Sequence, residues 1–308
     1  MPKANARNWR AAYVKEVTPG TTPASPMTII RTTGGGGRLS FTSEESEELH
    51  LNETPDFIRT NADGTITLNG EWSYGAVHWL LEALHQNTFA SNVLSVGSTL
   101  QTFTYEDQFT NITKFLPFKG CVVERLVISC ARGKVTWTAT LRPMVLPTAY
   151  AGATAGTGGP TAAATNPIVS HISGIQLAQE GGSLDLKGVG LTEWSIEWSR
   201  PSILYPQQGS LSSADIDQGN LVVRGSFSLY MPDSALLDKV LADTLSSVAL
   251  TVGGASTLKD AYLFSRVRLI DGGTQPVARN QSVIQQIQFG GTYDPTNTTS
   301  KVTRTPAA

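Results

Sequence analysis

The side chains that most often carry chemistry in proteins are few in this sequence and lie far apart. Histidine occurs four times, at His50, His78, His85 and His171, and cysteine twice, at Cys121 and Cys130. His78 and His85 are seven positions apart, about two turns of a helix, which is too far for both to bind one metal ion. The two cysteines are nine positions apart in one strand-like segment, and this odd spacing places them on opposite faces. We therefore expect buried free thiols, no metal and no cofactor.

Motifs for nucleophilic or phosphate chemistry are also missing from the sequence. Gly181-Gly182-Ser183 lacks the closing glycine of a Gly-x-Ser-x-Gly nucleophile elbow and is interpreted as a turn. Gly34–Gly37 is not followed by Lys and Ser or Thr, as a phosphate-binding loop would be, and is interpreted as a flexible joint. In the absence of an acid, base, nucleophile or metal cluster, we expect that the protein is not an enzyme.

Two further groups of residues each allow two interpretations. The acidic run Glu44, Glu45, Glu47 and Glu48 is either a solvated loop or an anionic surface along which a polyanion slides without sticking. Most of the six tryptophans occupy periodic strand or helix positions, which favours core or interface aromatics. The alternative is a carbohydrate-binding platform that includes Trp194 and Trp198.

Composition limits the partners of the chain. Residues 1–150 carry 13 basic and 13 acidic side chains, and residues 151–308 carry 10 and 12, so neither half has the positive excess that tight nucleic-acid binding requires. Charged residues make up only 16% of the 308 residues, which leaves little self-repulsion to oppose assembly. No run of about 18 apolar residues exists, so we expect no membrane span.

Composition also suggests how the chain is divided. Residues 147–167 contain no charge and no hydrophobic period, only small residues, Pro and Gly among them, and are interpreted as a linker between a first unit, 39–146, and a second, 168–290. Residues 1–38 and 291–308 have few periodic apolar positions. We interpret them as an N-terminal arm and a C-terminal tail, either disordered or ordered on a neighbouring subunit.

The two units share a pattern. In the first, alternating apolar residues around Gly70 lead into a leucine-rich helical segment at 76–84, and in the second a similar strand around Gly225 leads into a helical segment at 236–241, with Asp233 placed to cap it. Gly70 and Gly225 are 155 positions apart. This pattern indicates an internal duplication, and coincidence is the alternative.

Most other periodic segments alternate as strands do. They lie at 98–106, 122–130, 134–141, 191–198, 261–270 and 283–289, and Ala131-Arg132-Gly133 joins two of them as a short hairpin. Two helices among so many strands predict a β-rich α+β protein. We expect two tandem units, each a β-sandwich or partial barrel with one flanking helix.

In order along the chain, these segments resemble the tail tube proteins of long-tailed bacteriophages. The resemblance starts with YVKEVTPGTTP (13–23) and continues through TITLNGEWSYGAVHWLLEAL (65–84) and FLPFKGCVVERLVISCARGKVTWTATL (115–141), and VVRGSFSLYMPDSALLDKVL (222–241) resembles the C-terminal portion of the family. The positions that carry the family pattern are Glu16, Gly20, Thr21 and Pro23; Ser43 and Glu44; Gly70; Leu80, Leu81 and Leu84; and Phe118 to Gly120.

The resemblance implies a structural virion protein of a siphophage-like tail, assembled in the cytoplasm of the bacterial host. Such subunits close into rings by side-by-side sheet pairing, and the rings stack into a tube that conducts double-stranded DNA without binding it specifically. Two tube units in one chain imply a trimer per ring. The implied partners are further copies of the chain, the tape measure protein and the tail terminator, and the acidic run Glu44–Glu48 would line the lumen or join successive rings.

Two other functions stay open on the sequence alone. One is a different ring component of a virion, such as a tail terminator, a decoration protein or a baseplate protein, which would lack the duplicated unit. The other is the carbohydrate-binding β-module with exposed tryptophans.

Overall fold

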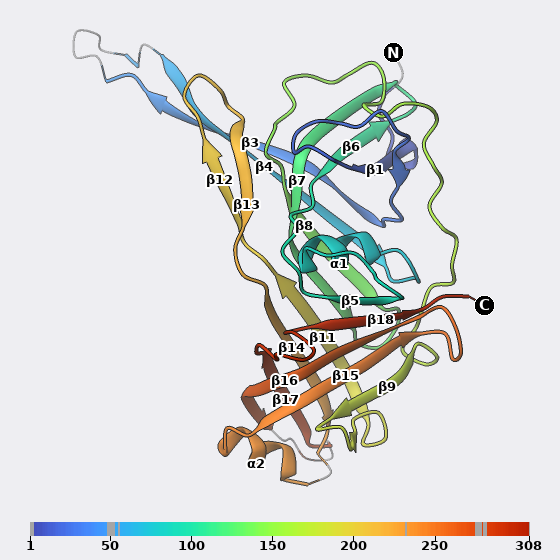
Figure 1. Ribbon diagram of the computed structural model, residues 1–308. Helices are drawn as coiled ribbons and strands as arrows, with labels where there is room; N and C mark the ends of the chain where they lie inside the picture. Colours follow the sequence, from blue (N-terminus) through green and yellow to red (C-terminus); the bar gives the residue numbers. More distant parts are fainter. Residues whose placement is uncertain are drawn as a thin grey trace.

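The chain is built mainly of antiparallel strands, with two helices and long connecting segments (Figure 1). The computed structural model describes residues 3–47, 53–54, 56–231, 233–274, 279 and 282–307. Up to the segment predicted to be a linker, the elements are η1 (Ala6–Asn8), β1 (Trp9–Lys15), β2 (Thr28–Ile29), β3 (Gly34–Glu45), β4 (Phe57–Glu71), α1 (His78–His85), β5 (Val93–Ser95), β6 (Phe103–Phe109), β7 (Lys114–Cys130) and β8 (Thr136–Arg142). After it follow β9 (Ile175–Glu180), β10 (Leu184–Asp185), β11 (Leu191–Ser199), β12 (Ser202–Pro206), β13 (Ser213–Gln218), β14 (Val222–Tyr230), α2 (Ala235–Leu241), β15 (Leu245–Gly253), β16 (Lys259–Thr274), β17 (Ile284–Gly291) and β18 (Lys301–Thr305).

The predicted β-rich α+β class with two helices is confirmed. In the described part of the chain, 16 strands belong to one connected sheet and β12 and β13 form a separate ribbon. The long strand β7 changes partners along its length: its first part pairs with β6 and its second part with β8. The same second part also pairs with β11, so strands from both halves of the sequence share one sheet.

The order of pairing is the same in the two halves. In the first half, successive neighbours are β1, β6, β7, β8, β4 and β3. In the second half they are β9, β15, β16, β17, β14 and β11. The helices also correspond, since α1 follows β4 and packs on β7, whereas α2 follows β14 and packs on β16.

Gly70 and Gly225 occupy equivalent places in these two orders. Gly70 lies opposite Trp137, and a Cβ atom at position 70 would come 2.4 Å from the indole ring. Gly225 lies opposite Phe289, and a Cβ atom there would come 2.3 Å from the phenyl ring. Each glycine therefore makes room for an aromatic ring of the next strand, which gives a physical reason for glycine within a strand.

The core runs through both halves without a break. Five of the six tryptophans are buried in it: Trp72, Trp79, Trp137, Trp194 and Trp198. Trp9 is partly buried and donates a hydrogen bond to Asp107. The interpretation as core aromatics is confirmed for the five, and an aromatic platform built on Trp194 and Trp198 is ruled out by their burial. Cys121 and Cys130 are free and buried, as expected, and burial raises the pKa of both thiols.

Helix α2 begins at Ala235, one residue before the predicted segment 236–241, and its N-cap position is Ser234 rather than the predicted Asp233, whose side chain still bonds to the first turn. The carboxylate of Asp233 accepts a hydrogen bond of 2.9 Å from the amide of Ala235, the first residue of the helix. Helix α1 buries most of its side chains, whereas α2 buries only Leu236. No helix in the described residues is long and apolar enough to cross a membrane.

Several segments that looked irregular in the sequence are ordered within the chain. Strand β1, inside the predicted N-terminal arm, pairs with β6 and buries Ala11 and Ala12. Strand β18, inside the predicted C-terminal tail, pairs with β16 and β5. The linker is held against the first half, because the buried carboxylate of Glu106 accepts hydrogen bonds from the Thr154 hydroxyl and the Ala155 amide.

The interpretation of Gly34–Gly37 as a flexible joint is wrong. These glycines begin β3, and a Cβ atom on Gly37 would lie 2.2 Å from the Phe118 ring. At Gly35, where φ is +129°, a Cβ atom would lie 2.1 Å from the Thr67 carbonyl oxygen. Gly35 and Gly37 therefore leave no space for a side chain, because other groups of the chain lie directly against them.

Candidate functional site

The histidines take part in structural contacts. His78 Nε2 lies 2.9 Å from both carboxylate oxygens of Asp260, which joins α1 to β16. His171 Nδ1 accepts a hydrogen bond from the Gly133 amide. His50 lies outside the described residues. Among the residues that the structure describes, no three His, Cys, Asp or Glu side chains come together as a metal site would require.

The carboxylate of Glu16 joins two separate parts of the family pattern. It accepts hydrogen bonds from the amide of Gly20 at 2.9 Å, from the amide of Gly120 at 3.0 Å and from the hydroxyl of Thr104 at 2.7 Å. Gly20 and Gly120 both have positive φ, of 77° and 62°, which glycine adopts without strain. The glutamate-to-glycine start and the Phe118–Gly120 element thus meet at one buried carboxylate. The sequence indicated both elements of the family pattern but not that they contact each other.

The contact between β7 and β11 is the place where the two halves of the sheet join. The pairing is antiparallel, with Ile196 opposite Ile128 and Ser195 opposite Ser129. Across the junction, Arg125 donates two hydrogen bonds to the Glu197 carboxylate, at 2.9 and 2.6 Å. These bonds hold the pKa of Glu197 below its ordinary value. The two halves are therefore joined by a continuous ladder of paired backbone residues and by the Arg125–Glu197 ion pair.

One face of this sheet is polar, and we refer to it below as the polar face. Its side chains alternate with the buried ones along β4, β8, β11, β14 and β17 and include Thr67, Asn69, Thr136, Thr138, Ser195, Glu197, Arg224, Ser226, Gln286 and Gln288. Hydrogen bonds link neighbours across strands, such as Thr138 to Asn69 and Ser195 to Ser226. Lys134 and Glu71 form an ion pair at the first-half end. Hydroxyl and amide groups therefore dominate this face. In the ion pairs Arg125–Glu197 and Lys134–Glu71, each basic group faces a carboxylate of the same chain.

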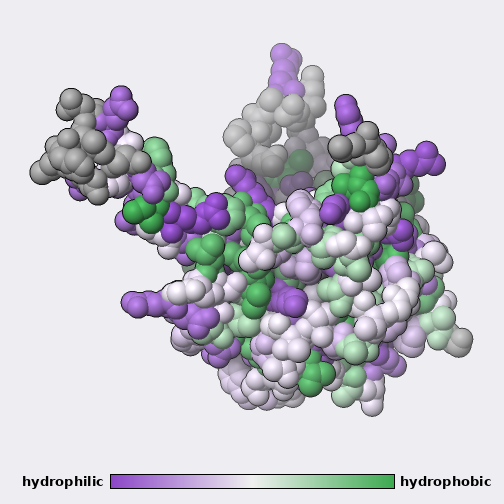
Figure 2. Space-filling model, turned by 90° about the horizontal axis from the view of Figure 1, so that it is seen from above, coloured by the Kyte–Doolittle hydropathy of each residue, from purple (hydrophilic) through white to green (hydrophobic). Residues whose placement is uncertain are grey.

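A second surface is a projecting arm, formed by residues 39–45 of β3 and 57–64 of β4 (Figures 1 and 2). The arm exposes large apolar side chains near its end: Phe41 is 47% exposed, Phe57 63% and Ile58 57%. The guanidinium of Arg59 lies 3.9 Å above the Phe41 ring. A two-stranded ribbon that exposes aromatic side chains gains little stability from contacts with the rest of its own chain. Such a surface is typical of an interaction site.

The acidic run lies at the far end of this arm. Glu44 and Glu45 are exposed in the last part of β3, opposite Ile58 and Phe57. Glu47 follows and is also exposed, whereas Glu48 lies outside the described residues. The structure thus separates the acidic run from the polar face and from Gly70 and Gly225, which lie in the body of the sheet.

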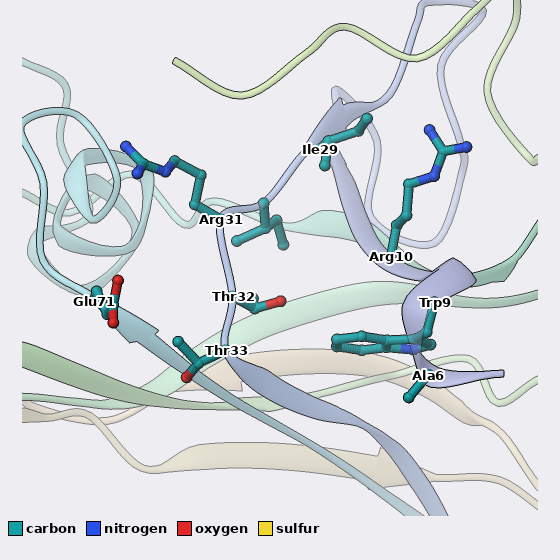
Figure 3. A pocket seen from close by; sticks show the side chains of 9 residues that line it. Ala6, Trp9, Arg10, Ile29, Arg31, Thr32, Thr33 and Glu71 are labelled. Carbon is teal, nitrogen blue, oxygen red and sulfur yellow. The ribbon is translucent and has the colours of Figure 1, made fainter. Parts of the chain in front are cut away.

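A third surface is a polar cleft of about 430 Å³ at the edge of the sheet, which we call the edge cleft (Figure 3). Arg31, Thr32 and Thr33 follow one another along it, with Glu71 on one side and Trp9 and Arg10 on the other. Arg31 donates hydrogen bonds to the carbonyl oxygen of Asn166 and to the Ser73 hydroxyl, which holds it in place. The sequence did not indicate that these residues lie together.

His85 provides a test of how the two halves are packed. It is fully buried, bonded through Nδ1 to the Leu81 carbonyl and through Nε2 to Ser300, and burial lowers the pKa of His85 from 6.5 to about 4. Below pH 6.5 the unfolded chain takes up a proton that the folded chain excludes, so stability present above pH 6.5 is lost as the pH falls. Urea unfolding should give about 2 kcal/mol less stability at pH 5 than at pH 7 from this group, since one pH unit corresponds to about 1.4 kcal/mol.

Replacing His85 by Gln should remove this part of the pH dependence. The Ser300→Ala variant is the matched control: it loses a bond to the same ring but keeps the titrating group, so its stability should fall at both pH values with the wild-type difference retained. An unchanged pH difference in His85→Gln would show that the histidine is not buried as described.

Comparison with known proteins identifies the chain. Residues 7–291 match the family described as phage tail tube protein, a span that begins before β1 and ends with β17. Among curated protein sequences, none matches. The family match covers nearly the whole chain, including the Glu16 contacts, both glycine–aromatic pairs and the β7–β11 junction. The chain therefore belongs to the phage tail tube protein family and is a structural component of a phage virion tail.

Proposed function

We propose that copies of this chain polymerise into rings that stack to form the tail tube, through which double-stranded DNA is held and delivered to the host. The observation that carries the proposal is the repeated strand order. It supports two tube units in one chain, the first extending ahead of the predicted 39–146 to take in β1 and the start of β3, the second running from β9 to the end of β17, close to the predicted 168–290, and hence a ring of three chains with pseudo-sixfold symmetry.

The polar face is the proposed wall of the lumen. Its hydroxyl and amide groups are neutral. Arg125 and Lys134 form ion pairs with Glu197 and Glu71, so their charges already have partners within the chain. Tight binding to DNA needs several free Lys or Arg side chains that replace the counterions of the phosphates. A wall of this composition lets DNA pass without adhering.

The arm is the proposed contact between successive rings. Its exposed Phe41, Phe57 and Ile58 would be covered by a subunit of the adjacent ring, and Glu44, Glu45, Glu47 and Glu48 would lie at that contact, away from the lumen. The tape measure protein inside the tube and the tail terminator at its end are the further partners of this proposal, and assembly takes place in the bacterial cytoplasm.

Electron microscopy of the concentrated purified protein tests the proposal. We expect rings and short tubes with an open channel. If the protein stays monomeric at high concentration, even with tape measure and terminator proteins added, the proposal fails. A different virion ring component is the second candidate, and rings that never stack into tubes would favour it.

A further inference from the structure

The charges of the first 56 residues are strongly separated along the sequence. Residues 1–43 contain six basic side chains and a single acidic one, Glu16, which is buried. Residues 44–56 contain six acidic side chains and no lysine or arginine. The first segment therefore has a net charge of +5 and the second of −6, in a chain whose total is only −2. Two surfaces of opposite charge are encoded next to each other in the sequence.

Strands β3 and β4 keep these two groups of charges apart in space. The acidic residues Glu44 and Glu45 lie where β3 ends, on the projecting arm (Figure 1). At the other end of the ribbon, Thr33 comes directly before β3, Glu71 is the last residue of β4, and both line the edge cleft. The 12 residues of β3 span roughly 35–40 Å at a rise of about 3.3 Å per residue. The acidic end of the arm therefore cannot reach the edge cleft of its own chain.

The edge cleft is bordered by arginines that have no carboxylate partner. Arg10 and Arg31 line it from two sides (Figure 3), and Arg7 is exposed in the neighbouring element η1. None of the ion pairs among the described residues involves any of these three side chains. Glu71, the acidic residue of the cleft lining, is paired with Lys134. The cleft is therefore a basic surface whose charge is not balanced within the chain.

The guanidinium groups of this surface have donors to offer. The three hydrogen bonds of Arg31 all start from Nη1 and end on neutral oxygen atoms, those of Ser73, Ala164 and Asn166. Its Nε and Nη2 make no hydrogen bond within the described part of the chain, and the same holds for the whole side chain of Arg10. Such groups form strong charge-assisted bonds with carboxylates.

Apolar side chains accompany the charges on both surfaces. On the arm, Phe57 lies directly opposite Glu45 and is 63% exposed. In the edge cleft, Trp9 and Ile29 lie beside the arginines and are only partly buried (Figure 3). An acidic surface with an exposed aromatic ring thus matches a basic surface with apolar side chains, which is the complementarity that favours association of two proteins.

We propose that the acidic end of the arm docks into the edge cleft of a second copy in the adjacent ring. The arm contributes the carboxylates of Glu44, Glu45 and Glu47, and the cleft contributes its three unpaired arginines. This inference rests on the proposed stacking of rings and adds the surface that receives the arm. Because the two surfaces lie at opposite ends of one ribbon, each contact leaves a free arm and a free cleft, and the stack grows without closing.

The same charges set the direction of stacking. Two arm ends repel each other because both are acidic, and two edge clefts repel each other because both are basic. Rings that meet with the same face are therefore disfavoured. Every ring in a tube should point the same way.

Reversing the charges of one surface at a time tests the contact. The cleft variant, Arg7→Glu with Arg10→Glu, makes the edge cleft acidic, and the arm variant, Glu44→Arg with Glu45→Arg, makes the end of the arm basic. Each should form rings but at least tenfold less tube in electron micrographs, because like charges then meet between successive rings. Arg31 is left unchanged, since its hydrogen bonds also hold the linker.

Mixing rings of the two variants is the decisive measurement. The acidic arm of the cleft variant fits the basic cleft of the arm variant, and the two reversed surfaces fit each other. Neither variant stacks on itself, so the mixture should recover at least half of the wild-type amount of tube, with the two kinds of ring in alternation. Two variants that had simply lost their structure would not recover on mixing.

A matched control changes the net charge equally at other positions. Arg132 and Lys187 are exposed in turns and do not line the edge cleft. Arg132→Glu with Lys187→Glu should therefore form tubes as the wild type does. Circular dichroism and the unfolding midpoint of the dilute protein should match the wild type for all three double variants.

A readout on the wild-type protein covers the case in which a variant does not fold. Amide hydrogen exchange should slow at 6–10 and at 44–47 when wild-type rings assemble into tubes. Wild-type amounts of tube from both reversed variants, intact rings that fail to recover tubes on mixing, or unchanged exchange at both segments overturn the docking and leave stacking through other surfaces standing. Absence of rings and tubes from the wild-type protein overturns the proposed function and the docking together.

Discussion

Replacing Glu16 by alanine should lower the free energy of unfolding of the single chain by about 3 kcal/mol or more. The carboxylate is only 6% exposed and is the acceptor for two backbone amides, of Gly20 and Gly120, and for the Thr104 hydroxyl. Bonds to a charged acceptor contribute about 1.5–3 kcal/mol each, and the buried donors left without a partner add to the cost. Urea or thermal unfolding of the dilute, unassembled protein measures the effect.

Two variants separate this effect from a general loss of charge. Glu45→Ala removes an exposed carboxylate on the arm and should change stability by less than about 0.5 kcal/mol. Glu16→Gln keeps the size and one accepting oxygen but turns an amide group towards a donor, so its loss should fall between the two. A Glu16→Ala protein as stable as Glu45→Ala would show that the carboxylate does not connect the Gly20 loop to Gly120 of β7.

Shortening the arm should abolish tubes while leaving rings intact. Phe41 and Ala62 are directly opposite each other, so replacing residues 42–61 by Asn-Gly closes the ribbon with a two-residue turn. The change removes Phe57 and Ile58 together with the whole acidic run, and it leaves the body of the sheet, including the β7–β11 junction, in place. Electron microscopy and sedimentation should then show single rings, with the amount of tube reduced at least tenfold.

A charge variant distinguishes the apolar part of the arm from its acidic end. Glu44→Gln with Glu45→Gln keeps Phe41, Phe57 and Ile58 in place, and we expect it to form tubes with altered salt dependence. Tubes of normal length from the shortened arm would contradict the assignment of the arm to ring stacking. Loss of rings as well as tubes would place the arm in ring closure.

Local pattern predicted the strands well where one face is buried and the other is wet. The alternation of Val135, Trp137 and Ala139 with polar residues marked β8, and the alternation around Gly225 marked β14. The strand β1 escaped notice because its buried positions include Ala11 and Ala12, whose small side chains give a weak hydrophobic signal. The glycines at the start of β3 were misinterpreted because the groups that crowd Gly35 and Gly37, the Thr67 carbonyl and the Phe118 ring, are remote in sequence.

Contacts between remote segments could not be predicted from one sequence. The pairing of β7 with β11 joins residues that are far apart in the sequence, such as Cys130 and Trp194, and no local period encodes it. The three donors of Glu16 come from the loop after β1 and from strands β6 and β7, although the motif residues Gly20 and Gly120 themselves were recognised. Gly70 and Gly225 were found from pattern alone, while their common cause, an aromatic ring on the adjacent strand, needed the structure.

The number of chains in one ring is the measurement on which the account depends. Native mass spectrometry of isolated rings, or the symmetry of class averages viewed down the axis, gives it without any variant. Two tube units per chain, joined within the chain by β7 and β11, predict three chains and six similar lobes around the channel. A ring of six chains would contradict the duplicated unit.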